Sequence, residues 1–156
     1  MSSGRVVYMN GTFVPEAEAQ ISIYDSALMF GDMVFEMTRT FHQKPYRLRH
    51  HLERLYNSLR YTEIDCGMDI DAMEAATMQT IETNIEALEG YDFQIMHNVT
   101  RGGLGLYDTI IKEGTTPIVT INVLPLVRHI GGMANKFSSG SHFVITPQLS
   151  VPARYI

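Results

Sequence analysis

The chain has 156 residues, of which 45% are hydrophobic and 19% charged, and its formal net charge is −5. This is the size and composition of one ordinary globular domain, which excludes a disordered, collagen-like or coiled-coil protein. No segment approaches the ~18 consecutive apolar residues of a spanning helix, and the N-terminus lacks the apolar core of a signal peptide. A single cysteine, Cys66, excludes an internal disulfide and a zinc-ribbon site. We therefore expect a soluble cytoplasmic protein with no membrane partner and no metal site.

The twelve lysines and arginines are spread along the chain, whereas a nucleic-acid-binding surface needs them clustered. We therefore expect no nucleic-acid partner, while a small anionic ligand held by one or two arginines stays open. Lysine is scarce, because only Lys44, Lys112 and Lys136 occur. Any chemistry that depends on a lysine has few candidates in this chain.

The first part of the chain predicts β-structure. Asn10 and Gly11 form a pair that readily supplies the positive φ angles of a two-residue turn, so residues 6–9 and 12–14 are predicted to pair as a hairpin. Residues 33–41 alternate in character from one position to the next. Such alternation is typical of a long strand with different chemistry on its two faces.

Two helices are predicted next, after a turn marked by Lys44 and Pro45. The first begins near residue 48, because apolar residues then recur every three or four positions, at Leu48, Leu52, Leu55, Tyr56 and Leu59. The second can be capped by Asp69 or Asp71 and ended by Gly90. Its predicted buried stripe consists of Ile70, Met73, Thr77, Ile81, Ile85 and Leu88. We expect this second helix to be purely architectural.

Residues 93–100 and 117–124 predict two more strands on either side of the glycine-rich segment 101–114. Strands and helices thus alternate without a regular βα repeat, which favours a two-layer α+β domain over a doubly wound parallel sheet. Residues 126–140 have a loop-like composition, and residues 142–146 (HFVIT) predict one further strand. A strand so placed has an edge and an apolar face that need partners.

Three features resemble functional motifs but lack an essential part. Residues 101–106 are rich in glycine but lack the G-x-G-x-x-G spacing and the GKS or GKT of a phosphate cradle, so a flexible loop that can gate substrate access is favoured. His50 and His51 point about 100° apart on a helix, which does not suit one metal ion. Cys66 follows an acidic residue, which disfavours a reactive thiolate.

The order of the motifs is more informative than any single residue. Residues 23–36 (IYDSALMFGDMVFE), followed by residues 51–58 (HLERLYNS), resemble the N-terminal half of the class IV aminotransferases. These fold-type IV pyridoxal-phosphate enzymes comprise branched-chain aminotransferases, D-amino-acid aminotransferases and aminodeoxychorismate lyases. Residues 7–11 (VYMNG) and 99–102 (VTRG) fit two further strands of that family, so the resemblance covers nearly the whole chain.

The resemblance implies roles for four residues. Arg54 matches the arginine that binds the phosphate of pyridoxal 5'-phosphate, a role that suits the fixed charge and donors of a guanidinium. Phe30 and Phe35 match aromatic positions of the substrate pocket. Arg101 lies on the stretch where relatives place binding of the substrate carboxylate, although on different residues, and Met96 stands where some branched-chain enzymes have arginine. Read without the resemblance, Arg54 is a helix-surface arginine and the two phenylalanines are core residues.

The resemblance also implies a lysine that binds the cofactor covalently and moves protons during amino transfer. In the family it follows a Pro-containing strand like residues 151–156, and none of the three lysines of this chain matches that motif. No catalytic residue is therefore assigned, and we expect a truncated, inactive chain that binds pyridoxal phosphate weakly or not at all. Its expected parts are an N-terminal α+β domain (1–124), an interdomain linker (125–140), and the truncated start, with the first strand, of the cofactor-binding C-terminal domain (141–156).

Two classes of function stay open. The first is pyridoxal-phosphate-dependent amino-group transfer between an amino acid, branched-chain or similar, and a 2-oxo acid, or an aminodeoxychorismate-lyase-like reaction, in the parent protein. The second is a non-catalytic binding domain that self-associates through the edge of residues 142–146. We expect a homodimer or a larger homo-oligomer, because the family builds its sites at a subunit boundary and the C-terminal segment adds apolar surface.

Overall fold

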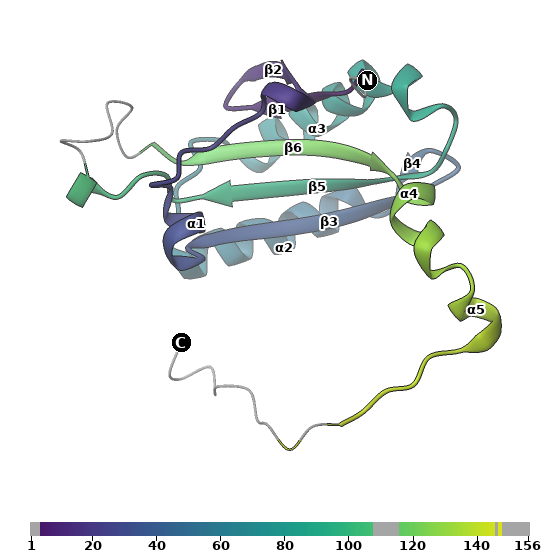
Figure 1. Ribbon diagram of the computed structural model, residues 1–156. Helices are drawn as coiled ribbons and strands as arrows, with labels where there is room; N and C mark the ends of the chain where they lie inside the picture. Colours follow the sequence, from purple (N-terminus) through teal and green to yellow (C-terminus); the bar gives the residue numbers. More distant parts are fainter. Residues whose placement is uncertain (1–3, 108–115, 146, 148–156) are drawn as a thin grey trace.

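The computed structural model describes residues 4–107, 116–145 and 147. Its centre is a six-stranded antiparallel sheet in the order β2-β1-β6-β5-β3-β4, with α2 and α3 packed on one face (Figure 1). The strands are β1 (Val6–Met9), β2 (Thr12–Pro15), β3 (Met33–Phe41), β4 (Lys44–Pro45), β5 (Phe93–Thr100) and β6 (Ile118–Pro125). The α-helices are α1 (Ser26–Phe30), α2 (Leu48–Thr62), α3 (Ile70–Asn84), α4 (Leu126–Ile130) and α5 (Lys136–Ser139). Short 3-10 turns cover Glu16–Glu18, Glu86–Leu88, Gly105–Tyr107 and Gly131–Met133. The predicted two-layer α+β architecture is confirmed.

The N-terminal hairpin forms as predicted. Met9 pairs with Thr12, and the two residues between them, Asn10 and Gly11, have φ angles of 45° and 90°. Asn10 also accepts a hydrogen bond from the amide of Val119 at 2.7 Å through its side-chain oxygen. The hairpin is thereby attached to β6, the next strand of the sheet.

β3 has the two distinct faces that its alternation predicts. Every second residue from Val34 to Thr40 is buried toward α2, and the residues between them are exposed on the opposite face.

The turn after β3 lies two residues earlier than the Lys44 and Pro45 positions that the sequence indicates. The chain reverses at His42 and Gln43, which have positive φ angles, and Lys44–Pro45 instead pairs with the end of β3. The reason lies at Asp92, whose Oδ1 accepts hydrogen bonds from the Gln43 amide and the Thr40 hydroxyl.

α2 begins at Leu48 as predicted and buries all four leucines of its stripe, while Tyr56 is half-buried. α3 begins at Ile70 and is capped by Asp69, whose carboxylate accepts a hydrogen bond from the Ala72 amide at 2.7 Å. Asp71 is therefore not the cap. The helix ends at Asn84 and continues as a 3-10 turn to Leu88, before Gly90, and Ile85 of the predicted stripe is exposed.

The core lies between the sheet and the two long helices. Its large fully buried apolar side chains come from α2, α3, the turn after α3, and the two central strands β5 and β6. They are Leu52, Leu55, Met73, Leu88, Phe93, Ile95, Val99, Val119, Ile121 and Val123. Burial of this apolar surface provides the main driving force for the fold.

The segment after β6 differs from the prediction. Residues 126–140 are not a loop, because they form α4, a 3-10 turn and α5. The Leu126 amide donates to the Asp92 carbonyl at 2.8 Å, which fixes the start of α4 against the sheet. The predicted strand 142–146 is also wrong for its described residues, 142–145, which are exposed, have no regular structure and run clear of the sheet (Figure 1). A strand exists only with a ladder partner, and these residues have none in the described part of the chain.

The proposed boundaries at residues 124 and 140 remain a prediction, and Thr146, Lys112 and residues 151–156 lie outside the described residues. Within the ranges given above, no helix is long and apolar enough to cross a membrane.

Candidate functional site

A charged cluster joins α2 to β3. Arg54 of α2 donates from Nε to Glu36 Oε2 at 2.6 Å and from Nη2 to Glu36 Oε1 at 2.5 Å. His51 Nδ1 lies 3.0 Å from the same Oε1, and the Met37 amide donates to it at 2.8 Å. His51 and Arg54 reach one carboxylate because residues three apart share a face of a helix. The cluster is therefore built by two regular elements.

Glu36 is ionised in this environment. Its side chain is only 3% exposed, and burial alone raises the pKa of a carboxyl group. Hydrogen bonds with Arg54, His51 and the Met37 amide outweigh that effect and lower the pKa of Glu36 to about 2. The pair between Glu36 and Arg54 thus carries both charges throughout the neutral pH range.

Arg54 is open to solvent on its other side. Its side chain is 69% exposed, although two of its N–H groups are bound to Glu36. Among the described residues, no hydrogen bond is made by its Nη1 atom. The terminal edge of the guanidinium, formed by Nη1 and the second hydrogen of Nη2, therefore offers two parallel donors. This donor set fits a phosphate oxygen pair.

α1 holds Phe30 at the surface. Asp25, which is fully buried, caps the helix through the Ala27 amide at 2.8 Å and accepts a hydrogen bond from the Thr100 hydroxyl at 2.9 Å. Gly31 ends the helix with a φ angle of 69°, in the region that favours glycine. Phe30 is 65% exposed and Phe35, on the outer face of β3, is 61% exposed. Neither is a core residue.

Arg101 has most of its donors engaged within the protein. It binds both carboxylate oxygens of Asp32, at 2.6 and 3.3 Å, and the carbonyls of Thr62 and Glu63 at 2.6 and 2.9 Å. These four bonds leave one of the five N–H groups of the guanidinium. Arg101 thus connects the start of β3 to the end of α2, a structural connection that sequence reasoning missed.

In the described part of the chain, no hydrogen bond or ion pair joins any two of the four residues predicted for the site. Arg54 lies on the α2 side of the strand and Phe35 on the opposite side, while Phe30 and Arg101 flank Asp32 at the start of the strand. In the described part of the chain, β4 pairs only with the last two residues of β3. The Arg39 carbonyl also accepts from the Tyr46 amide at 2.9 Å, so residues 33–38 form an open edge, without a strand partner among the described residues, between the Arg54 side and the Phe35 side.

Neither described lysine belongs to this cluster. Lys44 lies in β4 and Lys136 in α5, and neither forms a hydrogen bond or an ion pair with Glu36 or Arg54. Met96 pairs with Met37 in the register of β5 and β3. Among the described residues, no group of three or more His, Cys, Asp or Glu side chains could hold a metal ion.

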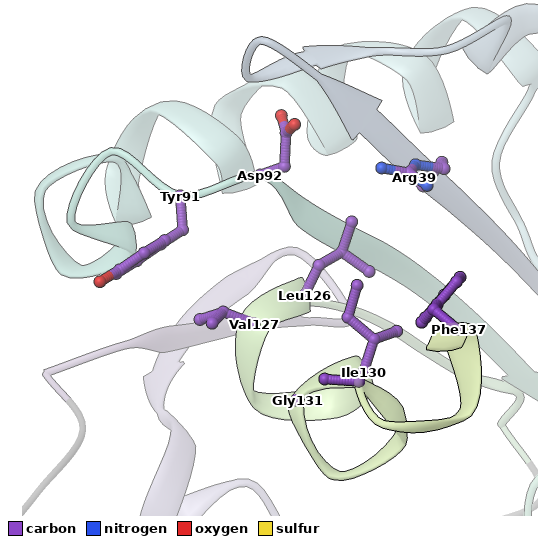
Figure 2. Close-up of a pocket in the computed structure, with 9 residues that line it drawn as sticks. Arg39, Tyr91, Asp92, Leu126, Val127, Ile130, Gly131 and Phe137 are labelled. Carbon is purple, nitrogen blue, oxygen red and sulfur yellow. The ribbon is translucent and has the colours of Figure 1, made fainter. Parts of the chain in front are cut away.

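A cavity of about 410 Å³ lies at the other end of β3. Figure 2 shows its walls: Arg39 and Asp92 on the sheet side, with Leu126, Ile130 and Phe137 on the segment after β6. None of the four predicted site residues lines it. Sequence reasoning missed this cavity because its second wall is made by helices in a segment with the composition of a loop.

A second missed feature is the buried His97. Its Nε2 lies 2.8 Å from the Thr77 hydroxyl, which itself donates to the Met73 carbonyl, so Nε2 carries the hydrogen. Burial lowers the pKa of His97 to about 4, although the neighbouring charge of Glu36 acts in the opposite direction. His97 is therefore neutral near pH 7 and belongs to the core rather than to an exposed site.

Residues 33–132 match the family described as amino-transferase class IV. This segment is well over half of the chain, so the chain belongs to the class IV aminotransferases, and the resemblance stated from the sequence is confirmed. A protein of Methanocaldococcus jannaschii with the provisional name branched-chain-amino-acid aminotransferase is 32% identical over 127 residues, which are 80% of this chain and 43% of that protein. The D-alanine aminotransferase of Staphylococcus haemolyticus is 27% identical over 78 residues, which are 50% of this chain and 28% of that enzyme.

Solved structures show the same fold. A branched-chain amino acid aminotransferase from the organism abbreviated T.th., with pyridoxamine 5'-phosphate, superposes with a TM-score of 0.65 at 26% identity, over 78% of this chain and 40% of that one. The branched-chain amino acid aminotransferase of Escherichia coli gives a TM-score of 0.65 at 25% identity, with the same coverage. The described fold thus matches the N-terminal domain of fold-type IV aminotransferases. The chain spans less than half the length of these relatives.

Proposed function

We propose that this chain forms the N-terminal part of a pyridoxal-phosphate-dependent enzyme that transfers an amino group between an amino acid and a 2-oxo acid. The observation that carries the proposal is the terminal edge of Arg54, two fixed donors beside the open edge of β3. A guanidinium held in this way suits the phosphate group of the cofactor. Membership of the class IV family supports the same assignment.

The proposed site residues have different tasks. Arg54 binds the phosphate and so places the cofactor at the open edge of β3. Phe30 and Phe35 cover the apolar side chain of the substrate and exclude water from it. Arg101 holds Asp32 and the end of α2 in place and has one N–H left for a substrate carboxylate. The bound cofactor supplies the electron-withdrawing ring system that amino transfer requires.

We propose a branched-chain or similar apolar amino acid as the substrate. Two large aromatic side chains, both more than half exposed, lie where they would be covered by an apolar substrate. The names of the M. jannaschii and E. coli relatives point to the same class, whereas the staphylococcal relatives are named for D-alanine. The side-chain size and the configuration of the amino donor are therefore what an assay must vary.

The proposal includes parts that lie outside the described residues. We propose that residues 1–124 are the N-terminal domain, 125–140 the interdomain linker, and 141–156 the first segment of the cofactor-binding domain. The lysine that binds the cofactor covalently then comes from another part of the protein, because none of Lys44, Lys112 and Lys136 matches the lysine motif of the family. We also propose a homodimer or a larger homo-oligomer, in the cytoplasm.

A panel of amino donors tests this proposal in the full-length protein. The protein is incubated with pyridoxal phosphate, 2-oxoglutarate and either L-leucine, L-alanine or D-alanine, and the new 2-oxo acid is measured. We expect the highest kcat/KM with L-leucine. A preference for D-alanine would contradict the proposed substrate. Consumption of aminodeoxychorismate, with no amino transfer from any donor, would identify a lyase instead.

A further inference from the structure

We propose that Glu36 is a positioning residue for the cofactor phosphate: it holds Arg54 so that only the terminal edge of the guanidinium faces the ligand. This inference rests on the proposed function, in which Arg54 binds that phosphate. Glu36 itself would not touch the cofactor.

The geometry of the pair carries the inference. A guanidinium is planar, and it can bind a two-oxygen group either through its side edge, Nε with one Nη, or through its terminal edge, Nη1 with Nη2. Glu36 occupies the side edge, with bonds of 2.6 Å from Nε and 2.5 Å from Nη2. A phosphate can then use only the terminal edge, which the structure leaves open to solvent.

Glu36 can act as a fixed anchor because it does not move freely itself. It lies in the middle of β3, is 3% exposed, and pairs in register with His97 of β5. Its Oε1 also contacts the Met37 amide at 2.8 Å and His51 Nδ1 at 3.0 Å. The carboxylate is thus held on several sides, and it restricts the long and otherwise solvated side chain of Arg54.

This arrangement reduces the ordering that binding would otherwise require. A free arginine side chain loses rotamer freedom when it binds a ligand, whereas Arg54 has lost that freedom before the ligand arrives. The negative charge of Glu36 has the opposite effect, because it repels a phosphate. We infer that orientation outweighs repulsion, since the guanidinium lies between the two anions.

The test compares two ligands that differ only in the phosphate. Dissociation constants of pyridoxal 5'-phosphate and of pyridoxal are measured in the full-length protein, and their ratio isolates the contribution of the phosphate. Glu36→Gln keeps the size of the side chain but removes the charge and places an amide donor against the guanidinium. We expect this variant to lower the phosphate preference by on the order of three- to tenfold, with the affinity for pyridoxal unchanged.

Glu16→Gln is the matched control. Glu16 forms the same kind of pair with Arg5, at 2.7 Å, next to β2 at the opposite edge of the sheet. The substitution changes the net charge equally and should leave the phosphate preference as it is in the unchanged protein. An equal loss in both variants would overturn the inference, as would an unchanged or higher phosphate preference in Glu36→Gln.

Two further variants separate the inference from the function on which it rests. Arg54→Ala should remove most of the phosphate preference, and an unchanged preference in that variant means that the proposed phosphate contact itself is wrong.

Arg54→Lys keeps the charge but has no guanidinium and therefore no terminal edge. It tests the role of orientation even where Glu36→Gln fails to fold. We expect Arg54→Lys to resemble Arg54→Ala. A lysine variant with the original preference would show that charge alone suffices, and Glu36 would then have no positioning role.

Discussion

The carboxylate of Glu36 binds the guanidinium of Arg54 through two parallel hydrogen bonds, of 2.6 and 2.5 Å, across the junction of β3 and α2. The two residues are 18 positions apart in the sequence, and each lies within a regular element. Sites built on strands and helices are more sharply defined than sites on loops. The direction in which Arg54 points is therefore a property of the fold.

The buried His97 predicts a pH-dependent stability. Its pKa is about 4 in the folded protein against an ordinary value of 6.5, so below pH 6.5 the unfolded chain takes up a proton that the folded chain does not. The free energy of unfolding should fall as the pH decreases from 6.5 and level off near 4, by roughly 3 kcal/mol at most. Urea unfolding at several pH values measures this change.

His97→Gln should remove most of that decrease, and the exposed His50→Gln should not. Glu36 affects this window only below pH 4.5, because its pKa is lowered and its contribution to stability is lost as the pH falls from 4.5 toward 2. An identical pH profile in His97→Gln and the unchanged protein would mean that His97 is not held neutral by the core.

Asn84 is predicted to contribute strongly to stability through the backbone of β1. Its side-chain oxygen accepts from the Val6 amide at 2.8 Å and its nitrogen donates to the Val6 carbonyl at 3.0 Å, so it serves as a strand partner at the end of α3. Asn84→Ala leaves both backbone groups unpaired and should cost about 2–3 kcal/mol in the free energy of unfolding. Thr83→Ala, at the exposed neighbouring position, should change it by less than about 0.5 kcal/mol. Similar losses in the two variants would contradict this role.

Asp25 is predicted to hold the segment that carries Phe30. Asp25→Ala removes both the cap of α1 and the contact with Thr100, so the amides of residues 26–31 should exchange with solvent faster. Asp69→Ala removes the cap of α3 and should accelerate exchange only at the start of that helix. Hydrogen exchange followed by mass spectrometry distinguishes the two. Protection of residues 26–31 that is unaffected by Asp25→Ala would show that α1 is held by other contacts.

The strands and long helices could be predicted because their periodicity is local. The alternation along 33–41 separates two faces, and the apolar stripe from Leu48 identifies α2. Neither pattern indicates which face of β3 is buried. The buried face contains the charged Glu36. Its carboxylate is stable there because Arg54 and His51 of α2 bind it. A partner that lies far away in the sequence leaves no periodic signal.

The same limit explains the errors after β6. Residues 126–140 look like a loop, yet a backbone bond to Asp92 starts a helix there. Residues 142–145 have the composition of a strand, but composition supplies no ladder partner. The resemblance to the family identified Arg54, Phe30, Phe35 and Arg101 as site residues. Only the structure shows that Arg101 already binds Asp32 and two carbonyls at the end of α2.

Retention of pyridoxal phosphate by Arg54→Ala and Arg60→Ala variants of the full-length protein tests the central claim most directly. Both substitutions remove an arginine from α2, and within the described residues the Arg60 guanidinium bonds only to the Asn57 side chain. Arg54→Ala should weaken the binding of the cofactor by about 1.5–3 kcal/mol, the usual contribution of a hydrogen bond to a charged group. Arg60→Ala should leave the dissociation constant unchanged. Equal weakening in both variants would contradict the assignment of Arg54 to the phosphate, because general electrostatic attraction would then account for the binding.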